Sequence, residues 1–185
     1  MAQNLAYLPV LTITPNGSST NPVYYVYGYK GTDLRVAHAK DLYFTYGALY
    51  NWEAARISCP SGWHLPTDGE WKVLEKYLGM RDQELDGTDW RLSGSVGDQL
   101  KESGTNHWHG PSNSTGITAL PGGMMAYNMG YTGFMDLGGA AYFWSATAYQ
   151  TLGAWIRFLA SGYPGMDRHY LGRQDGLSVR CVKDE

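Results

Sequence analysis

The feature that most restricts the fold of this chain is its joint richness in glycine and large aromatic residues. The sequence contains 24 Gly, 15 Tyr and 7 Trp, while only 17% of its residues are charged. Glycine permits turns that other residues resist, and Tyr and Trp provide large anchoring surfaces without long regular elements. The composition therefore predicts a loop-rich domain with the character of a binding scaffold. The alternative is that the rings simply fill a core that has few long helices.

Length and charge narrow the class of protein. The chain has 185 residues, 43% of them hydrophobic, which is typical of one globular domain and excludes intrinsic disorder. Its longest apolar runs are only a few residues, whereas a membrane-spanning helix needs about 20. The formal net charge is -3, and the 14 Lys and Arg residues are scattered. We therefore expect neither membrane insertion nor a nucleic acid partner.

Local patterns predict where the first regular elements lie. Apolar stretches in residues 1–30, separated by the turn-rich segment PNGSSTNP, predict two short strands. The spacing of apolar residues over 47–57 predicts a helix. A second helix is predicted to begin at Thr67, because Thr67 and Glu70 form a capping box, and to end at Gly79, a favoured left-handed residue.

The later part of the chain is predicted to change character near residue 122. Residues 80–122 carry isolated apolar anchors among polar residues, which indicates ordered loop with at most a short helix over 96–102. Beyond them the runs YFWSATAY, GAWIRFLA and GLSVRCV, separated by glycine-rich linkers, predict a small antiparallel sheet. Early helices and a late sheet make an α+β domain, and no composition shift divides residues 1–185.

The two cysteines, Cys59 and Cys181, leave two alternatives open. A bridge between them would close a loop of about 120 residues and stabilise the fold by roughly 5 kcal/mol. Two buried free thiols are the alternative, because the first residues, MAQNLAYLPV, show none of the marks of an export signal.

The residues that could perform catalysis or bind a metal form no recognisable site. His107 and His109 make an H-x-H pair, but no third ligand is evident. We therefore interpret them as loop residues that flank a buried Trp108 and not as zinc ligands. We interpret His64 as a packed structural residue. No serine-hydrolase, zinc-protease or phosphate-binding motif occurs, so no catalytic residue, cofactor or metal site is predicted. A structural calcium ion held by backbone carbonyls and Asp residues stays open.

Several long stretches carry a family resemblance: YGALYNW, CPSGWHLPTDGEW, LKESGTNHW, TGITALPGG, FWSAT and GLSVRCVKD. Together they closely resemble the Fibrobacter succinogenes major paralogous domain, which is found in surface proteins of Bacteroidetes-type bacteria. The resemblance implies a C-type lectin-like fold, in the branch of the formylglycine-generating, sulfatase-activating enzymes. It implies two helices packed on a small twisted antiparallel sheet, long ordered loops and neighbouring chain ends. It also favours the bridge between Cys59 and Cys181.

The same family is similar to the variable proteins of diversity-generating retroelements in gut bacteria and phages. This likeness implies a ligand surface within about 122–176, on residues interleaved with a fixed scaffold. The expected ligand-binding residues are Met125, Tyr127, Tyr131, Tyr149, Gln150, Leu152, Ile156, Phe158, Tyr163, Met166, His169, Tyr170, Leu171 and Gln174. The expected scaffold residues are Trp63, Trp71, Trp144, Trp155, Arg157, Arg168 and Arg180.

Strand alternation supports a division between two faces. Along AWIRFLA it would place Trp155 and Arg157 on the face that holds the fold, and Ile156 and Phe158 on a free face. Aromatic residues on a free face match antibody-like binding surfaces. The alternative is that residues 122–140 cover Ile156 and Phe158.

We therefore predict a non-catalytic domain of receptor or adhesin type, which recognises a protein or glycan through an aromatic surface of the kind that a retroelement diversifies. The first alternative is a structural cell-envelope module whose aromatic face packs against a neighbouring domain. A sulfatase-activating enzyme is a further alternative, and it would need a reactive cysteine pair. The family resemblance places the chain on a bacterial surface, in a secreted longer chain or in a phage tail.

Overall fold

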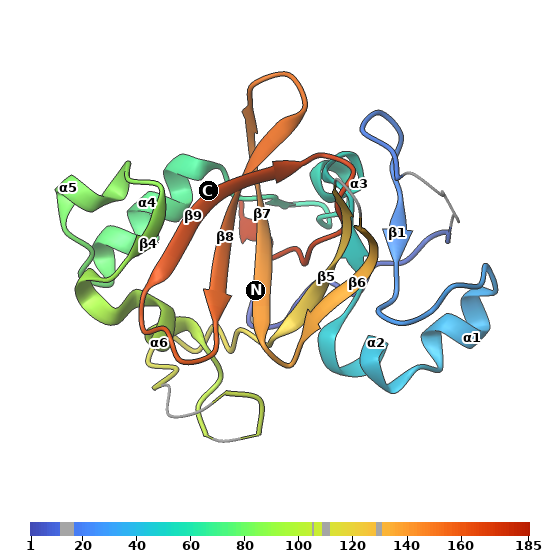
Figure 1. The fold of residues 1–185 in the computed structure, drawn as a ribbon, viewed down its shortest axis with the longest axis horizontal. Helices are drawn as coiled ribbons and strands as arrows, with labels where there is room; N and C mark the ends of the chain where they lie inside the picture. The colour runs from blue at the N-terminus through green and yellow to red at the C-terminus, as the bar shows by residue number, and fades with distance from the viewer. Residues whose placement is uncertain (12–16, 105, 109–111, 129–130) are drawn as a thin grey trace.

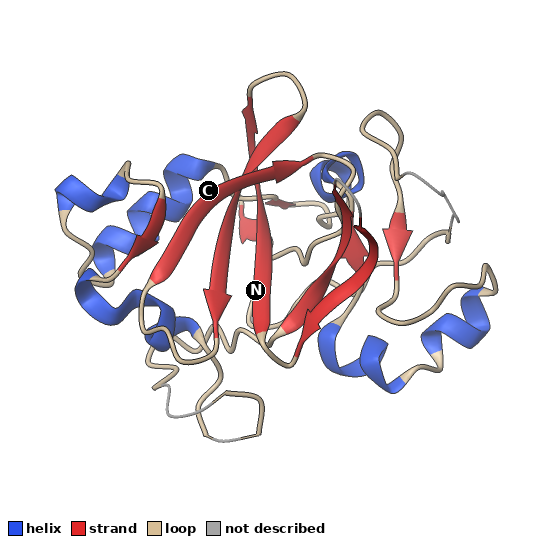
Figure 2. Ribbon diagram, in the orientation of Figure 1, coloured by secondary structure: helices blue, strands red, loops and turns tan. Residues whose placement is uncertain are grey.

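A twisted sheet of six strands runs through the middle of the molecule, and helices lie on both sides of it in this view (Figures 1 and 2). The computed structural model describes residues 1–11, 17–104, 106–108, 112–128 and 131–185. The helices of these parts are α1 Leu34–His38, α2 Asp41–Tyr46, α3 Trp52–Ile57, α4 Asp68–Tyr77, α5 Asp82–Leu85, the 3-10 helix η1 Ser93–Ser95 and α6 Val96–Leu100. The strands are β1 Tyr24–Tyr25, β2 Leu49–Tyr50, β3 Trp63–His64, β4 Asp89–Arg91, β5 Gly122–Asn128, β6 Tyr131–Leu137, β7 Ala140–Tyr149, β8 Gly153–Ala160, β9 Met166–Gly172 and β10 Val182–Lys183.

The large sheet has the strand order β4-β9-β8-β7-β5-β6. Neighbouring strands are antiparallel, except that β5 runs parallel to β7. Two small antiparallel pairs, β1 with β2 and β3 with β10, tie earlier segments to the rest of the chain. The molecule is thus a mixed α/β structure, which agrees with the predicted coarse class.

Both faces of the large sheet are buried over part of their area. Because alternate residues of a strand point to opposite faces, Trp144 and Ile156, which lie opposite each other on β7 and β8, share one face. They belong to one hydrophobic core. Phe143 and Leu159 face the other way and join a second core with Trp71 of α4. The expectation of one buried and one free face is therefore wrong over most of β8.

Helix α4 confirms the prediction made from its capping box. The Thr67 hydroxyl accepts a hydrogen bond from the Glu70 backbone N–H at 3.2 Å, and the Glu70 carboxylate accepts one from the Thr67 N–H at 2.8 Å. Gly79 follows the helix with a φ of 98°, a left-handed conformation that suits glycine. The buried side of the helix is narrow, because Val73 and Tyr77 are 71% and 86% exposed.

Buried ion pairs join α4 to the large sheet. Arg91 donates two hydrogen bonds to the fully buried Glu75, at 2.7 and 2.9 Å, and Arg157 donates to the same carboxylate. Arg157 and Arg168 both donate to Asp68, at 2.8 and 2.9 Å. Burial alone would raise the pKa of Asp68, but the two arginines outweigh it and hold that pKa well below its usual range. Arg157 and Arg168 therefore join strands β8 and β9 to α4 through buried carboxylates.

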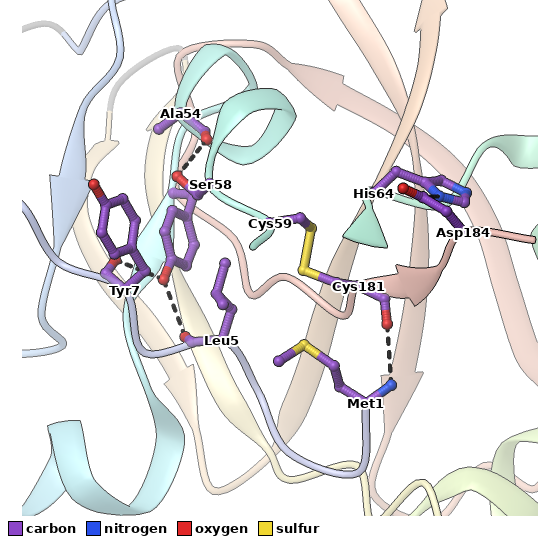
Figure 3. Close-up of a disulfide and its surroundings, with 10 residues drawn as sticks. Met1, Leu5, Tyr7, Ala54, Ser58, Cys59, His64, Cys181 and Asp184 are labelled. Atoms are coloured by element: carbon purple, nitrogen blue, oxygen red, sulfur yellow. Dashed lines mark hydrogen bonds and ion pairs between the residues drawn. A yellow bond between two sulfur atoms is a disulfide. The ribbon is translucent and has the colours of Figure 1, made fainter. Parts of the chain in front are cut away.

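The beginning and the end of the chain lie side by side, as the family resemblance implied (Figure 3). A disulfide joins Cys59, just after α3, to Cys181, just before β10, so the pairing favoured by the resemblance is present. The Met1 nitrogen donates to the Cys181 carbonyl at 3.0 Å. The buried Arg180 donates to the carbonyls of Ile117 and Thr118, at 2.6 and 2.9 Å, which makes it a structural anchor as predicted.

Several predicted elements differ from the structure. The helix predicted over 47–57 is confined to α3, and six short α-helices are described where two were expected. In the described part of residues 1–30 the predicted pair of strands is represented by β1 alone. The predicted strand GLSVRCV is mostly irregular, because Gly176, Leu177 and Ser178 each bridge to a different segment. No continuous ladder can form where the partner changes at each residue.

Candidate functional site

Four aromatic rings form a continuous row on the large sheet, and we call them the aromatic row. They are Tyr142 of β7, Phe158 of β8, Trp90 of β4 and Tyr163 of the loop after β8. The Tyr142 and Phe158 rings stack with centroids 4.6 Å apart, and the Trp90 and Tyr163 rings stack at the same spacing. The Trp90 ring lies 5.1 Å from the Phe158 ring, which joins the two pairs.

Strand register explains why these rings meet. Phe158 lies opposite Tyr142 on β7 and opposite Asp167 on β9, and Asp167 in turn lies opposite Trp90 on β4. Asp167 therefore stands between Phe158 and Trp90 in one line across the sheet, and the two rings meet beside it. This arrangement accounts for the burial of the Asp167 side chain, whose residue is only 7% exposed.

A hollow of about 250 Å³ opens beside the aromatic row. The side chains that line it come from strands β4, β7, β8 and β9. They are Asp89, Tyr142, Ile156, Phe158, Asp167, His169 and Leu171. Four of them, Ile156, Phe158, His169 and Leu171, are among the predicted ligand-binding residues, so the structure brings these four together.

The acidic side chains that line the hollow differ in the hydrogen-bond and charge partners that they have. The Asp167 carboxylate accepts no hydrogen bond from the described residues, and its Oδ1 atom is fully buried. Burial raises the pKa of Asp167, and the nearby imidazole of His169 offsets only part of that rise. The His169 Nδ1 atom lies 3.9 Å from the Asp89 carboxylate, and both of these side chains are open to solvent. The Tyr142 hydroxyl donates to Asp136 at 2.6 Å.

A second group of predicted residues lies on the opposite face of the sheet. Tyr149 stacks on Tyr170 at 4.0 Å and meets the edge of Trp155 at 4.7 Å. The Arg168 guanidinium lies 3.6 Å from the centre of the Trp155 ring. Because Trp155 lies opposite Tyr170 on β9, this cluster points away from the hollow. Trp155 is only partly buried, so the expected scaffold residue and the expected ligand residues form one partly exposed cluster.

The remaining predicted residues are spread over other parts of the surface. Met125 and Tyr127 of β5 are partly buried and pack against the small core of β1 and β2. Gln174 donates from its side chain to the Tyr127 carbonyl at 3.2 Å. Exposed positions away from the hollow include Tyr131, Gln150 and Leu152.

Two predicted ligand-binding residues are buried. Ile156 is 2% exposed because it faces Trp144 within the first core, which residues of β5 also enter. Although it is almost fully buried, Ile156 is one of the residues that line the hollow. Met166, at the start of β9, is fully buried in the second core. Among the expected scaffold residues, Trp71 and Trp144 are buried and Trp63 is partly buried.

Four residues of the site were missed by sequence reasoning: Asp89, Trp90, Tyr142 and Asp167. Alternation could have found Asp167, because it shares a face with His169. Tyr142 lies at the site because it pairs with Phe158 on β8. The pairing of β4 with β9 brings Asp89 and Trp90 to the site. Nothing in the loop-like sequence around residue 90 indicates that partner.

Two of the histidines discussed in the sequence analysis, His64 and His107, lie close to carboxylate side chains. The His64 ring lies 2.6 Å from both Glu70 and Asp184, and these two carboxylates raise its pKa, with Asp184 contributing most. His107 lies 2.6 Å from Glu102, whereas His109 lies outside the described residues. Within the parts of the chain that the structure describes, no three His, Cys, Asp or Glu side chains converge to hold a metal ion.

Comparisons with known proteins give one match. No curated protein and no solved structure matches the sequence. None of the described helices is long and apolar enough to cross a lipid bilayer. The family model of the Fibrobacter succinogenes major domain, however, matches residues 1–183. The chain therefore belongs to the Fibrobacter succinogenes major domain family.

Proposed function

We propose that this chain is a non-catalytic ligand-binding domain, of receptor or adhesin type, which recognises a protein or a glycan. The aromatic row and the hollow beside it carry this proposal. Rigid rings give a large contact area for little loss of side-chain entropy, which makes them efficient binding residues. Here the rings of four separate segments form one row, and two of them, Tyr142 and Phe158, line a concave surface, which is the usual form of a recognition site.

The proposal includes the finer classification that the resemblance implies. A single C-type lectin-like domain spanning residues 1–185 would present residues of 122–176, together with β4, as its ligand surface. Retroelement diversification would act on the exposed positions of that surface. The corresponding locations are a bacterial cell surface, a secreted longer chain or a phage tail. A sulfatase-activating activity is disfavoured, because both cysteines of the chain are joined in the disulfide.

The test is capture of the labelled chain by a panel of gut bacterial cells, purified surface proteins and purified surface glycans. One variant changes Tyr149, Phe158, Tyr163 and Tyr170 to Ser. The control variant, Phe44→Ser with Tyr77→Ser, removes two rings that are 75% and 86% exposed elsewhere on the molecule. The single change Tyr163→Ser, at a half-exposed ring, serves if the fourfold variant fails to fold.

We expect the parent and the control variant to be captured by the same target, and the folded fourfold variant to lose capture. The Tyr163→Ser variant should be captured more weakly than the parent, because it removes one end of the aromatic row. Undiminished capture of the fourfold variant would contradict the proposed surface. A parent chain that captures no member of the panel would contradict the proposed function.

A separate apolar groove favours one second candidate, a cell-envelope module that packs against a neighbouring domain. The groove has a volume of about 560 Å³ and runs along the exposed side of α4. Its apolar lining includes Val73, Leu74, Tyr77, Ile117 and Val182. Large exposed apolar surfaces commonly mark contacts with other proteins. In a longer chain, Tyr77→Ser would then loosen the packing of domains without reducing ligand capture.

A further inference from the structure

The hollow offers a ligand hydrogen-bond acceptors but few donors. Its polar lining consists of the Asp89 and Asp167 carboxylates, the His169 imidazole and the Tyr142 hydroxyl. The Tyr142 hydroxyl already donates to Asp136, and no Lys, Arg, Asn or Gln side chain is among the lining residues. A ligand group that only donates hydrogen bonds therefore suits this lining better than one that must also accept them.

Asp167 gives the strongest indication of what that group is. It is more than nine-tenths buried, it lines the hollow, and its carboxylate receives no hydrogen bond from the described residues. The nearest arginines do not serve it, because Arg91 pairs with Glu75 and Arg157 pairs with Glu75 and Asp68. A buried carboxylate without a partner is costly, so its presence needs an explanation, and a hydrogen-bond donor supplied by a ligand is one.

The aromatic row favours the same kind of ligand. The faces of Trp, Tyr and Phe rings attract cations that approach to within about 6 Å, and aromatic cages use this attraction to bind ammonium groups. Here the Phe158 and Trp90 rings flank Asp167 in the line across the sheet, so rings and carboxylate would act on one bound group. The Asp89 carboxylate, which is open to solvent, adds a second negative charge at the rim.

Size argues for one side-chain group and against a sugar ring. A hollow of about 250 Å³ is smaller than the ~300–1,000 Å³ pockets that enclose whole small molecules. A pyranose ring carries hydroxyls that each donate and accept, and most of its acceptors would stay unpaired here. The ammonium of lysine and the guanidinium of arginine carry donors alone.

We propose that the hollow binds the positively charged side chain of a lysine or arginine that projects from a protein ligand. This inference rests on the proposed binding function and specifies the chemistry that the aromatic row and Asp167 recognise. The side chain would insert its charged end toward Asp167, with its methylene groups against Phe158 and Leu171. Asp89 would attract the approaching cation from the rim.

The test is an NMR titration of the isotope-labelled 185-residue chain with four probes. N-acetyl-lysine methylamide and N-acetyl-arginine methylamide supply the two cations, N-acetyl-norleucine methylamide supplies a neutral chain of similar shape, and methyl glucoside represents a sugar. The main variant, Asp167→Asn, removes the charge and keeps the shape. Asp89→Asn is a second variant whose exposed side chain leaves the fold undisturbed, and Asp82→Asn on α5 is the matched control for a surface acid.

We expect saturable shifts of the signals of Phe158, Asp167, His169 and Leu171 with at least one cationic probe. Binding should be weaker by about tenfold or more for norleucine and for Asp167→Asn, reduced severalfold by Asp89→Asn, and unchanged by Asp82→Asn. Equal binding of norleucine or of methyl glucoside would overturn the inference, and so would unchanged binding by Asp167→Asn.

The same variants separate this inference from the proposed function. Capture of a panel target that survives Asp167→Asn, with no saturable response to either cation, overturns the inference and leaves the binding function standing. Capture of a protein target that Asp167→Asn abolishes, and that free lysine or arginine amide competes away, supports both. If the parent chain captures no member of the panel, that result contradicts the proposed function itself.

Discussion

The carboxyl group of Asp175 is buried in the turn that leads from β9 back to β5. Its Oδ1 atom accepts a hydrogen bond from the Tyr127 backbone N–H at 2.7 Å, and the residue is 4% exposed. Burial raises the pKa of Asp175 from 3.8 to about 6, because the backbone hydrogen bonds recover only part of the lost hydration. The folded state therefore holds this proton to a higher pH than the unfolded state does.

This difference predicts a pH dependence of stability. Below pH 3.8 the group is protonated in both states, and its contribution to stability is fully present. That contribution is lost as the pH rises through about 6, by on the order of 3 kcal/mol in total. Asp175→Asn keeps the acceptor oxygen but has no proton to lose. Relative to the parent, we expect its free energy of unfolding in urea to increase between pH 4 and about 7. A difference that stays constant with pH would show that Asp175 has an ordinary pKa in the folded chain.

The residues of the candidate site could be predicted only in part. Phe158, His169 and Leu171 were expected because the family resemblance implies a ligand surface within 122–176. The burial of Ile156 was not predicted, because alternation gives the two faces of a strand but not what covers each face. Trp90 and Asp89 were missed, because only the register of β4 against β9 brings them there.

Among the elements, α4 depends most on local sequence, and its N-terminus can be tested directly. The Thr67 hydroxyl satisfies the Glu70 N–H, which has no partner within the helix. Thr67→Ala should lower the free energy of unfolding by about 1 kcal/mol, since such a cap is typically worth that much. Thr67→Ser keeps the hydroxyl and serves as the control, so it should unfold close to the parent. Equal losses in both variants would mean that the methyl group of Thr67, and not its capping hydrogen bond, stabilises the helix.

Elements that depend on distant partners were harder to predict. The capping box and Gly79 mark both ends of α4 within the chain itself, so this helix was predicted with both ends close to their observed positions. The hairpin of β5 and β6 has a glycine-rich sequence without regular alternation, and its parallel contact with β7 is a single bridge. The prediction of a strand over GLSVRCV was wrong for a different reason. Its residues favour extended structure, but they pair in turn with β5, β2 and β7.

For the molecule as a whole, the last segment of the chain is the link that joins the separate parts. Leu5 donates its N–H to the Val179 carbonyl at 3.0 Å, and Arg180 reaches the carbonyls of Ile117 and Thr118. These contacts are individual hydrogen bonds and not the continuous ladders of a sheet, so each can break without disrupting the others. The disulfide between Cys59 and Cys181 closes a separation of 122 residues and holds this segment in place.

The disulfide should therefore stabilise the whole fold chiefly by restricting the unfolded chain. For a loop of this length the chain-entropy model gives about 5 kcal/mol, and the measured value falls below it where the reduced chain keeps residual structure. We expect reduction to lower the free energy of unfolding in urea by up to this amount while the near-UV circular dichroism of the folded chain is retained. The double variant Cys59→Ala with Cys181→Ala is the control, because reductant has no bond to break in it. Coincident unfolding curves for the oxidised and reduced parent would show that the bonds of Leu5 and Arg180 hold the segment without the disulfide.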